Sequence, residues 1–158
     1  MPIVRLSVNG LPVSAQVEPA TLLVDLLRGE LALTGTHVGC DTRQCGACTV
    51  LLRGDAVKSC TVLAVQAEGA EVTTIEGISS DGKLHPLQES FATEGGAQCG
   101  ICTPGMIMAA LHVPRGASTS VIQETLAGNL CRCTGYEAIY RSVKKAAGKT
   151  RTRVRAGR

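Results

Sequence analysis

Residues 39–50 read Gly39-Cys-Asp-Thr-Arg-Gln-Cys-Gly-Ala-Cys-Thr-Val50, and this stretch decides the fold. It supplies most of the first of two cysteine quartets, which comprises Cys40, Cys45, Cys48 and Cys60. The second quartet has a different internal spacing and comprises Cys99, Cys102, Cys131 and Cys133. Thiolates gathered by short loops make a soft-ligand site, which suits zinc or iron–sulfur far better than a hard cation. The sequence therefore predicts two metal centres in one small protein.

The spacing of the first quartet is C-x4-C-x2-C followed by a more distant cysteine, which is typical of plant-type [2Fe–2S] ferredoxins. Gly39, Gly46 and Gly100 each adjoin a cysteine. Glycine lets the backbone approach a cluster sulfur closely, although ordinary turn propensity also explains any one of the three. Structural zinc is the main alternative, because four cysteines in close pairs are its usual signature. Spacing alone favours iron–sulfur at the first quartet and leaves the second open between the two.

Other uses of the cysteines fit less well. The N-terminus lacks a secretory signal, so the chain is expected to be cytoplasmic, where thiols stay reduced and disulfides are rare. Thr49 and Thr103, not histidine, follow the two Cys-x2-Cys pairs, which excludes covalent haem attachment. A thioredoxin-like dithiol would leave six cysteines without a role. A Rieske site needs two histidines, and His37 is the only one near the complete first quartet.

The first half of the chain has the pattern of a small sheet with one helix. Ile3–Val8 alternates in polarity, Asn9-Gly10 is a strong hairpin turn, and Leu11–Val17 resumes the strand pattern. Thr21–Leu31 then places four leucines on one helical face. Further strands are expected over Thr49–Arg53, Ala56–Lys58 and Glu71–Ile75. Strand, strand and helix in this order begin a β-grasp, ferredoxin-like fold.

The second half changes to a helical period after a linker over Gly77–Gly82. Helices are expected over Pro86–Glu94, after an N-cap at Thr103, and after capping boxes that begin at Ser120 and Thr134. The sequence therefore predicts an α+β protein, with a β-grasp domain over residues 1–77 and a four-helix domain over residues 83–148. Residues 149–158 are expected to form a flexible basic tail.

Composition and charge limit the partners. Aromatic residues make up 2% of the chain, which argues against a base-stacking nucleic-acid surface. No apolar run approaches the ~20 residues of a membrane span. The net charge is +3, yet Lys144 to Arg158 holds seven basic residues and no acid. We interpret this segment as a solvated tail; a docking arm for an acidic partner or nucleic acid is the alternative.

Three motifs around the cysteines resemble those of the iron–sulfur (small) subunit of the xanthine dehydrogenase family of molybdenum hydroxylases. This family includes carbon monoxide, aldehyde, isoquinoline and nicotinate dehydrogenases. The first motif is the opening stretch, the second is Gln98-Cys-Gly-Ile-Cys-Thr-Pro-Gly-Met106, and the third is Gly128-Asn-Leu-Cys-Arg-Cys-Thr-Gly-Tyr136. The similarity covers residues 3–147 in order. One departure is a 28-residue gap between Cys102 and Cys131, which is shorter than usual and indicates a trimmed loop near residues 112–116.

The resemblance implies a plant-type ferredoxin domain and a four-helix domain, each holding one [2Fe–2S] cluster. By this likeness the second quartet binds the proximal cluster, nearest the molybdopterin of a large partner subunit, and the first quartet binds the distal cluster. Gln98 matches a glutamine that hydrogen-bonds the pterin, and Cys133 is also close to it. Electrons would leave towards FAD on a medium subunit or another acceptor. No catalytic residue is implied, so the chain would be the electron-transfer subunit of an oxidoreductase and not catalytic alone. An independent two-cluster ferredoxin and a two-zinc interaction module are the alternatives.

Overall fold

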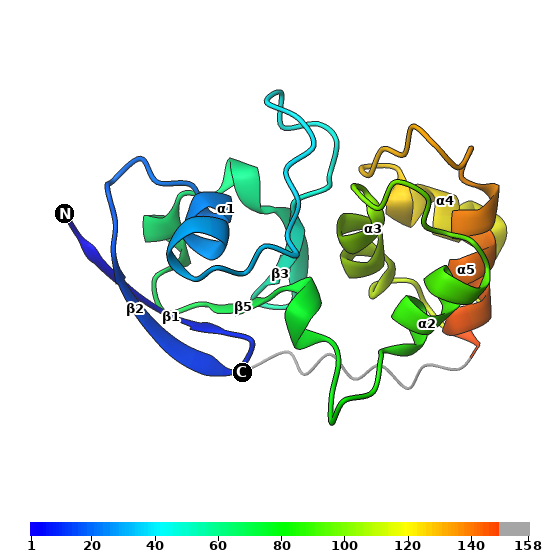
Figure 1. The fold of residues 1–158 in the computed structure, drawn as a ribbon, viewed down its shortest axis with the longest axis horizontal. Coiled ribbons are helices and arrows are strands. Elements are labelled where there is room, and N and C mark those ends of the chain that lie inside the picture. The colour runs from blue at the N-terminus through cyan, green and yellow to red at the C-terminus, as the bar shows by residue number, and fades with distance from the viewer. Residues whose placement is uncertain (149–158) are drawn as a thin grey trace.

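The protein is described here by a computed structural model that covers residues 1–148, and the predicted basic tail at 149–158 lies outside the described residues. Figure 1 shows two lobes side by side, a sheet lobe followed along the chain by a helical lobe. The predicted α+β fold class, a β-grasp unit and then a four-helix unit, is confirmed. Within the described residues no helix is long and apolar enough to cross a bilayer.

The sheet lobe contains five strands in the spatial order β2-β1-β5-β3-β4. Their bounds are β1 Ile3–Val8, β2 Leu11–Gln16, β3 Thr49–Leu52, β4 Asp55–Lys58 and β5 Glu71–Thr73. Strands β1 and β5 run parallel, and the other neighbouring strands pair antiparallel. The predicted turn at Asn9-Gly10 is confirmed, because both residues have positive φ, as a two-residue hairpin of this twist requires. Pro12 is tolerated because β2 is an edge strand.

The predicted helix over Thr21–Leu31 is shorter than expected, and its second part is a π-helix, which is wider than an α-helix. Helix α1 covers Leu23–Asp25 and continues as a π-helical segment over Leu26–Glu30. Leu22 stays extended because it forms a β-bridge with Leu63, and this contact keeps it out of the helix. Leu23, Leu26 and Leu27 of the predicted leucine face are nevertheless buried in the core of this lobe. The buried core of this lobe comprises Val4, Leu6, Val8, Val17, Leu23, Leu26, Leu27, Val50, Ala64, Ala67, Ala70 and Val72.

Four helices form the second lobe, as the sequence predicts. They are α2 Pro86–Thr93, α3 Thr103–Ala110, α4 Thr119–Leu126 and α5 Glu137–Ala147. Their buried faces meet in a second core of Leu87, Phe91, Cys102, Met106, Ile107, Ala109, Ala110, Ile122, Leu126, Ile139, Val143 and Ala146. Ile75 and Ile78, in the connecting segment, pack against this core. The connection is therefore held to the helical lobe by apolar contact.

Three predicted helix starts are wrong in detail. The N-cap of α4 is Ser118, whose hydroxyl accepts from the Val121 N–H, and not Ser120. Thr103 is the first residue of α3 and not its N-cap. Thr134 does not cap α5 either, because Tyr136 precedes that helix with a left-handed backbone at φ 70°. The Thr134 hydroxyl is instead directed towards a cysteine, as described below.

Removing the one phenylalanine is expected to destabilise the helical lobe. Phe91 is 2% exposed and lies between helices that pack through their apolar faces. Phe91→Ala should cost about 3–5 kcal/mol, because it leaves a cavity where ring contacts were. Thermal unfolding followed by circular dichroism measures the loss. Leu84→Ala, at a side chain 54% exposed, is the control and should leave the unfolding temperature almost unchanged; equal effects of the two variants would contradict this packing.

Candidate metal centres

The β3–β4 hairpin brings half of the first quartet together. Its register pairs Thr49 with Lys58, so Cys48 and Ser59 face each other just beyond the paired residues. The Ser59 N–H and hydroxyl donate to the Cys48 carbonyl at 3.3 and 2.7 Å. Cys60 is consequently placed near Cys48, and the two thiols interact. A hairpin register thus joins two cysteines that are well separated in the sequence.

The other half of the first quartet is held by backbone amides. The Cys45 N–H donates to Cys40 Sγ at 3.5 Å, and the Ala47 N–H donates to Cys45 Sγ at 3.5 Å. The thiols of Cys40 and Cys45 also interact directly. N–H groups directed at sulfur favour the thiolate and tune the potential of a bound cluster. This loop therefore has the donors that a thiolate-bound cluster needs.

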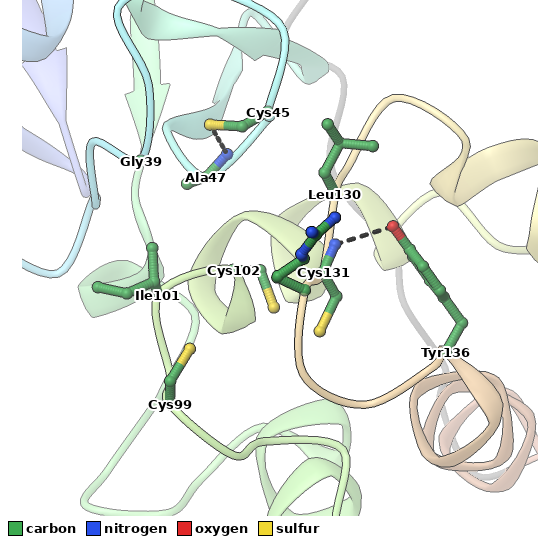
Figure 2. A pocket seen from close by; sticks show the side chains of 10 residues that line it. Gly39, Cys45, Ala47, Cys99, Ile101, Cys102, Leu130, Cys131 and Tyr136 are labelled. Carbon is green, nitrogen blue, oxygen red and sulfur yellow. Dashed lines mark hydrogen bonds between the residues drawn. The ribbon is translucent and has the colours of Figure 1, made fainter.

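The second quartet gathers at the N-terminus of α3 and in the loop before α5. Cys99 and Cys133 are exposed and their thiols interact, while the thiol of Cys102, 8% exposed, interacts with that of Cys131. Figure 2 shows the sulfurs of Cys99, Cys102 and Cys131 turned towards the same space. The structure thus brings together both predicted quartets.

Within each quartet the thiols interact most strongly in two pairs, and the two pairs lie close enough to influence each other. In the described part of the chain, no group of three or more His, Cys, Asp or Glu side chains is placed to hold a single metal ion. A dinuclear cluster offers each of its two irons to a different pair of thiolates. The pairing in both quartets, Cys40 with Cys45, Cys48 with Cys60, Cys99 with Cys133 and Cys102 with Cys131, therefore fits a [2Fe–2S] group.

The protonation of the thiols depends on burial and on nearby donors. The Cys45 N–H lowers the pKa of Cys40 to about 6. Burial raises the pKa of Cys60 to about 11 and that of Cys102 to about 12. Burial also acts to raise the pKa of Cys131, but the hydroxyl and N–H of Thr134 outweigh it, so this pKa is lowered. Metal binding must therefore displace protons from the buried thiols, since thiolate is the ligand form.

A cavity of about 390 Å³ lies where the two cysteine-bearing loops meet (Figure 2). The sheet lobe lines it with Gly39, Cys45 and Ala47, and the helical lobe lines it with Cys99, Ile101, Cys102, Leu130, Cys131, Arg132 and Tyr136. Both lobes therefore contribute cysteines to one shared space. Arg132, an exposed cation, lies at this cavity.

The two cysteine loops are joined by direct hydrogen bonds between the lobes. The Leu130 N–H donates to the Cys45 carbonyl at 2.8 Å. The buried Asn129 amide donates to the Gly46 carbonyl at 2.8 Å. A Cβ on Gly105 would lie 2.2 Å from the same Gly46 oxygen, so only glycine fits there. The two quartets are thus held in fixed relation by hydrogen bonds and a close backbone contact directly beside the cysteines.

The residues predicted to face a partner subunit share one exposed edge. Gln98 is exposed and directly precedes Cys99, whose thiol contacts the exposed Cys133. The histidines lie elsewhere: His37 Nδ1 is 3.1 Å from the Ile101 carbonyl, which holds it at the contact between the lobes. The Rieske alternative therefore gains no support from the position of His37.

Asn129 and Gly105 lie inside the sequence motifs, but sequence reasoning gives neither of them a role. Their partner, the Gly46 carbonyl, is distant in the sequence, and the Asn129 bond spans 83 residues. The sequence explains Gly46 only by close approach of the backbone to sulfur. The structure adds a different reason, because a Cβ at Gly46 would lie 2.5 Å from the Gly128 carbonyl of the other lobe. No local pattern carries such information.

Comparison with known proteins agrees with this geometry. A family model described as a 2Fe-2S iron-sulfur cluster binding domain matches residues 6–74, and one described as a [2Fe-2S] binding domain matches residues 74–144. The protein therefore belongs to the class of chains with two [2Fe–2S] domains in succession.

Individual relatives identify the family within this class of two-domain chains. Caffeine dehydrogenase subunit gamma of a Pseudomonas species is 46% identical over 155 residues, which cover 94% of this chain and 92% of that protein. The xanthine dehydrogenase iron-sulfur-binding subunit of Escherichia coli is 46% identical over 145 residues, covering 89% of this chain and 91% of that one. Quinoline 2-oxidoreductase from Pseudomonas putida 86 superposes with a TM-score of 0.88 at 43% identity, covering 92% of each chain. The chain belongs to the iron–sulfur subunits of the xanthine dehydrogenase family.

Adding a side-chain methyl group at Gly46 is expected to weaken the contact between the lobes and to destabilise the protein. Gly46→Ala places a Cβ against the Gly128 carbonyl on a residue with φ +75°. We expect a loss of roughly 2–4 kcal/mol, from left-handed strain and from overpacking together. The matched control is Gly69→Ala, because Gly69 has φ +67° and open space around it. Thermal unfolding should show a clearly larger loss for Gly46→Ala; equal losses would mean that the contact between the lobes contributes nothing.

Proposed function

We propose that this chain is the electron-relay subunit of a molybdenum-dependent oxidoreductase. The observation that carries the proposal is the presence of two paired thiol quartets whose loops are hydrogen-bonded to each other. The chain would accept two electrons, one per cluster, from a molybdopterin centre in a large partner subunit. It would pass them to FAD on a medium subunit or to another acceptor, and would hold no catalytic residue of its own.

The ligand assignment follows the two quartets. Cys40, Cys45, Cys48 and Cys60 would hold the distal cluster, and Cys99, Cys102, Cys131 and Cys133 the proximal one. A [2Fe–2S] cluster, when bound, supplies a one-electron redox couple. The chain's own part is to provide four thiolates per site, to direct N–H groups at the sulfurs and to limit water. We propose residues 1–77 and 83–148 as the two cluster-binding units, working in the cytoplasm, where thiols stay reduced.

The entry side of the relay is proposed at the edge that carries Gln98 and Cys133. Both are exposed, so a partner surface can reach them directly; Gln98 precedes Cys99 in the chain, and the Cys99 thiol interacts with that of Cys133. The amide of Gln98 has the donors and acceptor needed to hydrogen-bond a pterin ring. The first quartet is more enclosed, with Cys48 3% exposed and Cys60 9% exposed. Exposure thus supports entry at the helical lobe.

The connection between the sites is proposed to run along the backbone. Cys131 is bonded covalently to Leu130, whose N–H donates to the carbonyl of Cys45 at 2.8 Å. One hydrogen bond therefore joins a proposed ligand of one cluster to a proposed ligand of the other. Asn129 supports this joint by holding the neighbouring Gly46 carbonyl. Its burial, at 5% exposed, protects the joint from competing water.

Metal analysis tests the class of the protein. Anaerobically purified chain should contain about four irons and about four acid-labile sulfides, two of each per cluster. On reduction with dithionite it should give paramagnetic signals of two distinct centres. Zinc without sulfide would instead indicate the two-zinc interaction module and overturn the proposal.

Two cysteine variants test the direction of electron flow in the complex co-purified with its partners. Cys133→Ser should abolish reduction of both clusters by the partner's substrate, because the proposed entry site is lost. Cys60→Ser should leave the proximal cluster reducible by that substrate while acceptor turnover stops. Freeze-quenched electron paramagnetic resonance measures both, with iron content as the control for assembly. Continued reduction of the distal cluster in assembled Cys133→Ser would reverse the proposed order.

A further inference from the structure

The loop between α4 and α5 directs a hydroxyl at one of the cysteines. Thr134 Oγ1 lies 3.1 Å from Cys131 Sγ, and the Thr134 N–H donates to the same sulfur at 3.5 Å. The next bonds hold the loop in place: the Tyr136 N–H donates to Thr134 Oγ1 at 3.0 Å, and the Cys131 N–H donates to the Tyr136 hydroxyl at 2.8 Å. The dashed line between Cys131 and Tyr136 in Figure 2 marks the last of these.

The direction of the hydroxyl bond follows from counting protons. The oxygen of Thr134 already accepts from the Tyr136 N–H, and its single hydrogen is left to donate. A cysteine thiolate can only accept. The bond between Thr134 Oγ1 and Cys131 Sγ therefore runs from hydroxyl to sulfur whenever Cys131 is a metal ligand. With the Thr134 N–H, that sulfur then receives two donors from one residue.

The backbone of this loop is bent to make these bonds. Gly135 has φ 64° and Tyr136 has φ 70°, so two consecutive residues are left-handed. Such a conformation is unfavourable for tyrosine and persists only where its surroundings hold it. Stacking of the Tyr136 ring on Tyr140, with centroids 5.9 Å apart, and the hydroxyl bond from the Cys131 N–H supply that hold. The loop that carries Thr134 is thus held at Cys131, which precedes it, and at Tyr136, which follows it.

We propose that Thr134 sets the reduction potential of the helical-lobe cluster by donating its hydroxyl to Cys131 Sγ. A donor to a ligand sulfur stabilises the reduced cluster more than the oxidised one, because the reduced cluster carries one more negative charge. Thr134 therefore raises the potential of this cluster. The inference rests on the proposed function. It adds a positioning residue that controls the driving force for electron transfer between the lobes.

The test is a redox titration of the intact complex, with dithionite as electron donor and paramagnetic resonance as readout. Thr134→Val removes the hydroxyl and keeps the shape of the side chain. Its helical-lobe cluster should show a roughly tenfold shift of the one-electron equilibrium towards the oxidised form, or about 59 mV. The other cluster serves as an internal reference and should titrate as in the wild type.

Two matched variants separate tuning from structure. Thr134→Ser keeps the hydroxyl and should restore the wild-type potential. Thr125→Val removes a hydroxyl that donates to the Val121 carbonyl on α4, and should change neither potential. Thr134→Ala is titrated as well, because it removes the hydroxyl without adding a methyl group in its place. A lowered potential in either variant that lacks the hydroxyl, restored in Thr134→Ser, supports the proposal.

An unchanged potential in Thr134→Val and Thr134→Ala, with both clusters present, would overturn the inference and leave the proposed function standing. Loss of the helical-lobe cluster from both variants, with retention in Thr134→Ser, would also overturn it, since the hydroxyl would then serve assembly. Absence of two [2Fe–2S] signals in the wild type would overturn the proposed function itself. The two failures are therefore distinguishable.

Discussion

The carbonyl of Gly46 is the point on which the arrangement of both sites depends. It accepts a hydrogen bond from Thr49 within its own lobe and another from Asn129 in the other lobe, and it lies against the backbone of Gly105. A buried polar group of this kind is costly unless fully paired, and a complete network is rigid. Because Gly46 directly follows Cys45, this rigidity is transmitted to a proposed metal ligand. The lobes are docked at their cysteine loops, so the distance between the sites is fixed by the same atoms that fix each site.

The two cores explain why metal sites suit such a chain. Each lobe has fewer than 80 residues, and domains of this size bury too little surface to be stable by a wide margin. Among the described residues, Phe91 is the one aromatic side chain in the buried set of either core, and the other members are mostly aliphatic. A bound cluster adds its binding free energy to folding, since the site does not exist in the unfolded chain. Its thiolates would join segments that are distant in the sequence, such as Cys102 at the start of α3 and Cys131 before α5.

Much of the fold was predictable because it depends on local patterns. The alternation in β1, the turn at Asn9-Gly10 and the helical periods of the second half each involve residues close in sequence, and the structure contains all of them. The helix starts are misplaced by one or two residues, and one helix is shortened because a distant residue competes with a local preference. Leu22 leaves the predicted helix because Leu63 pairs with it as a strand. The cysteines could be found from spacing, but the contact of Asn129 with Gly46 spans 83 residues and has no local signature.

Thr134 shows how such a competition can indicate function. A threonine three residues before Glu137 is a helix-capping pattern, and propensity alone places its hydroxyl on the backbone of α5. In the structure the Thr134 hydroxyl hydrogen-bonds to Cys131 Sγ, and α5 begins after Tyr136, which has a left-handed backbone. A capping bond is worth about 1 kcal/mol, and a left-handed non-glycine residue costs a similar amount. At this one loop the fold therefore lacks the stabilising capping bond and also bears the cost of a left-handed tyrosine. Local rules are broken most often where a site requires it. Here the Thr134 oxygen accepts from the Tyr136 N–H and not from an N–H of α5, and its hydrogen is directed at the sulfur of a proposed ligand.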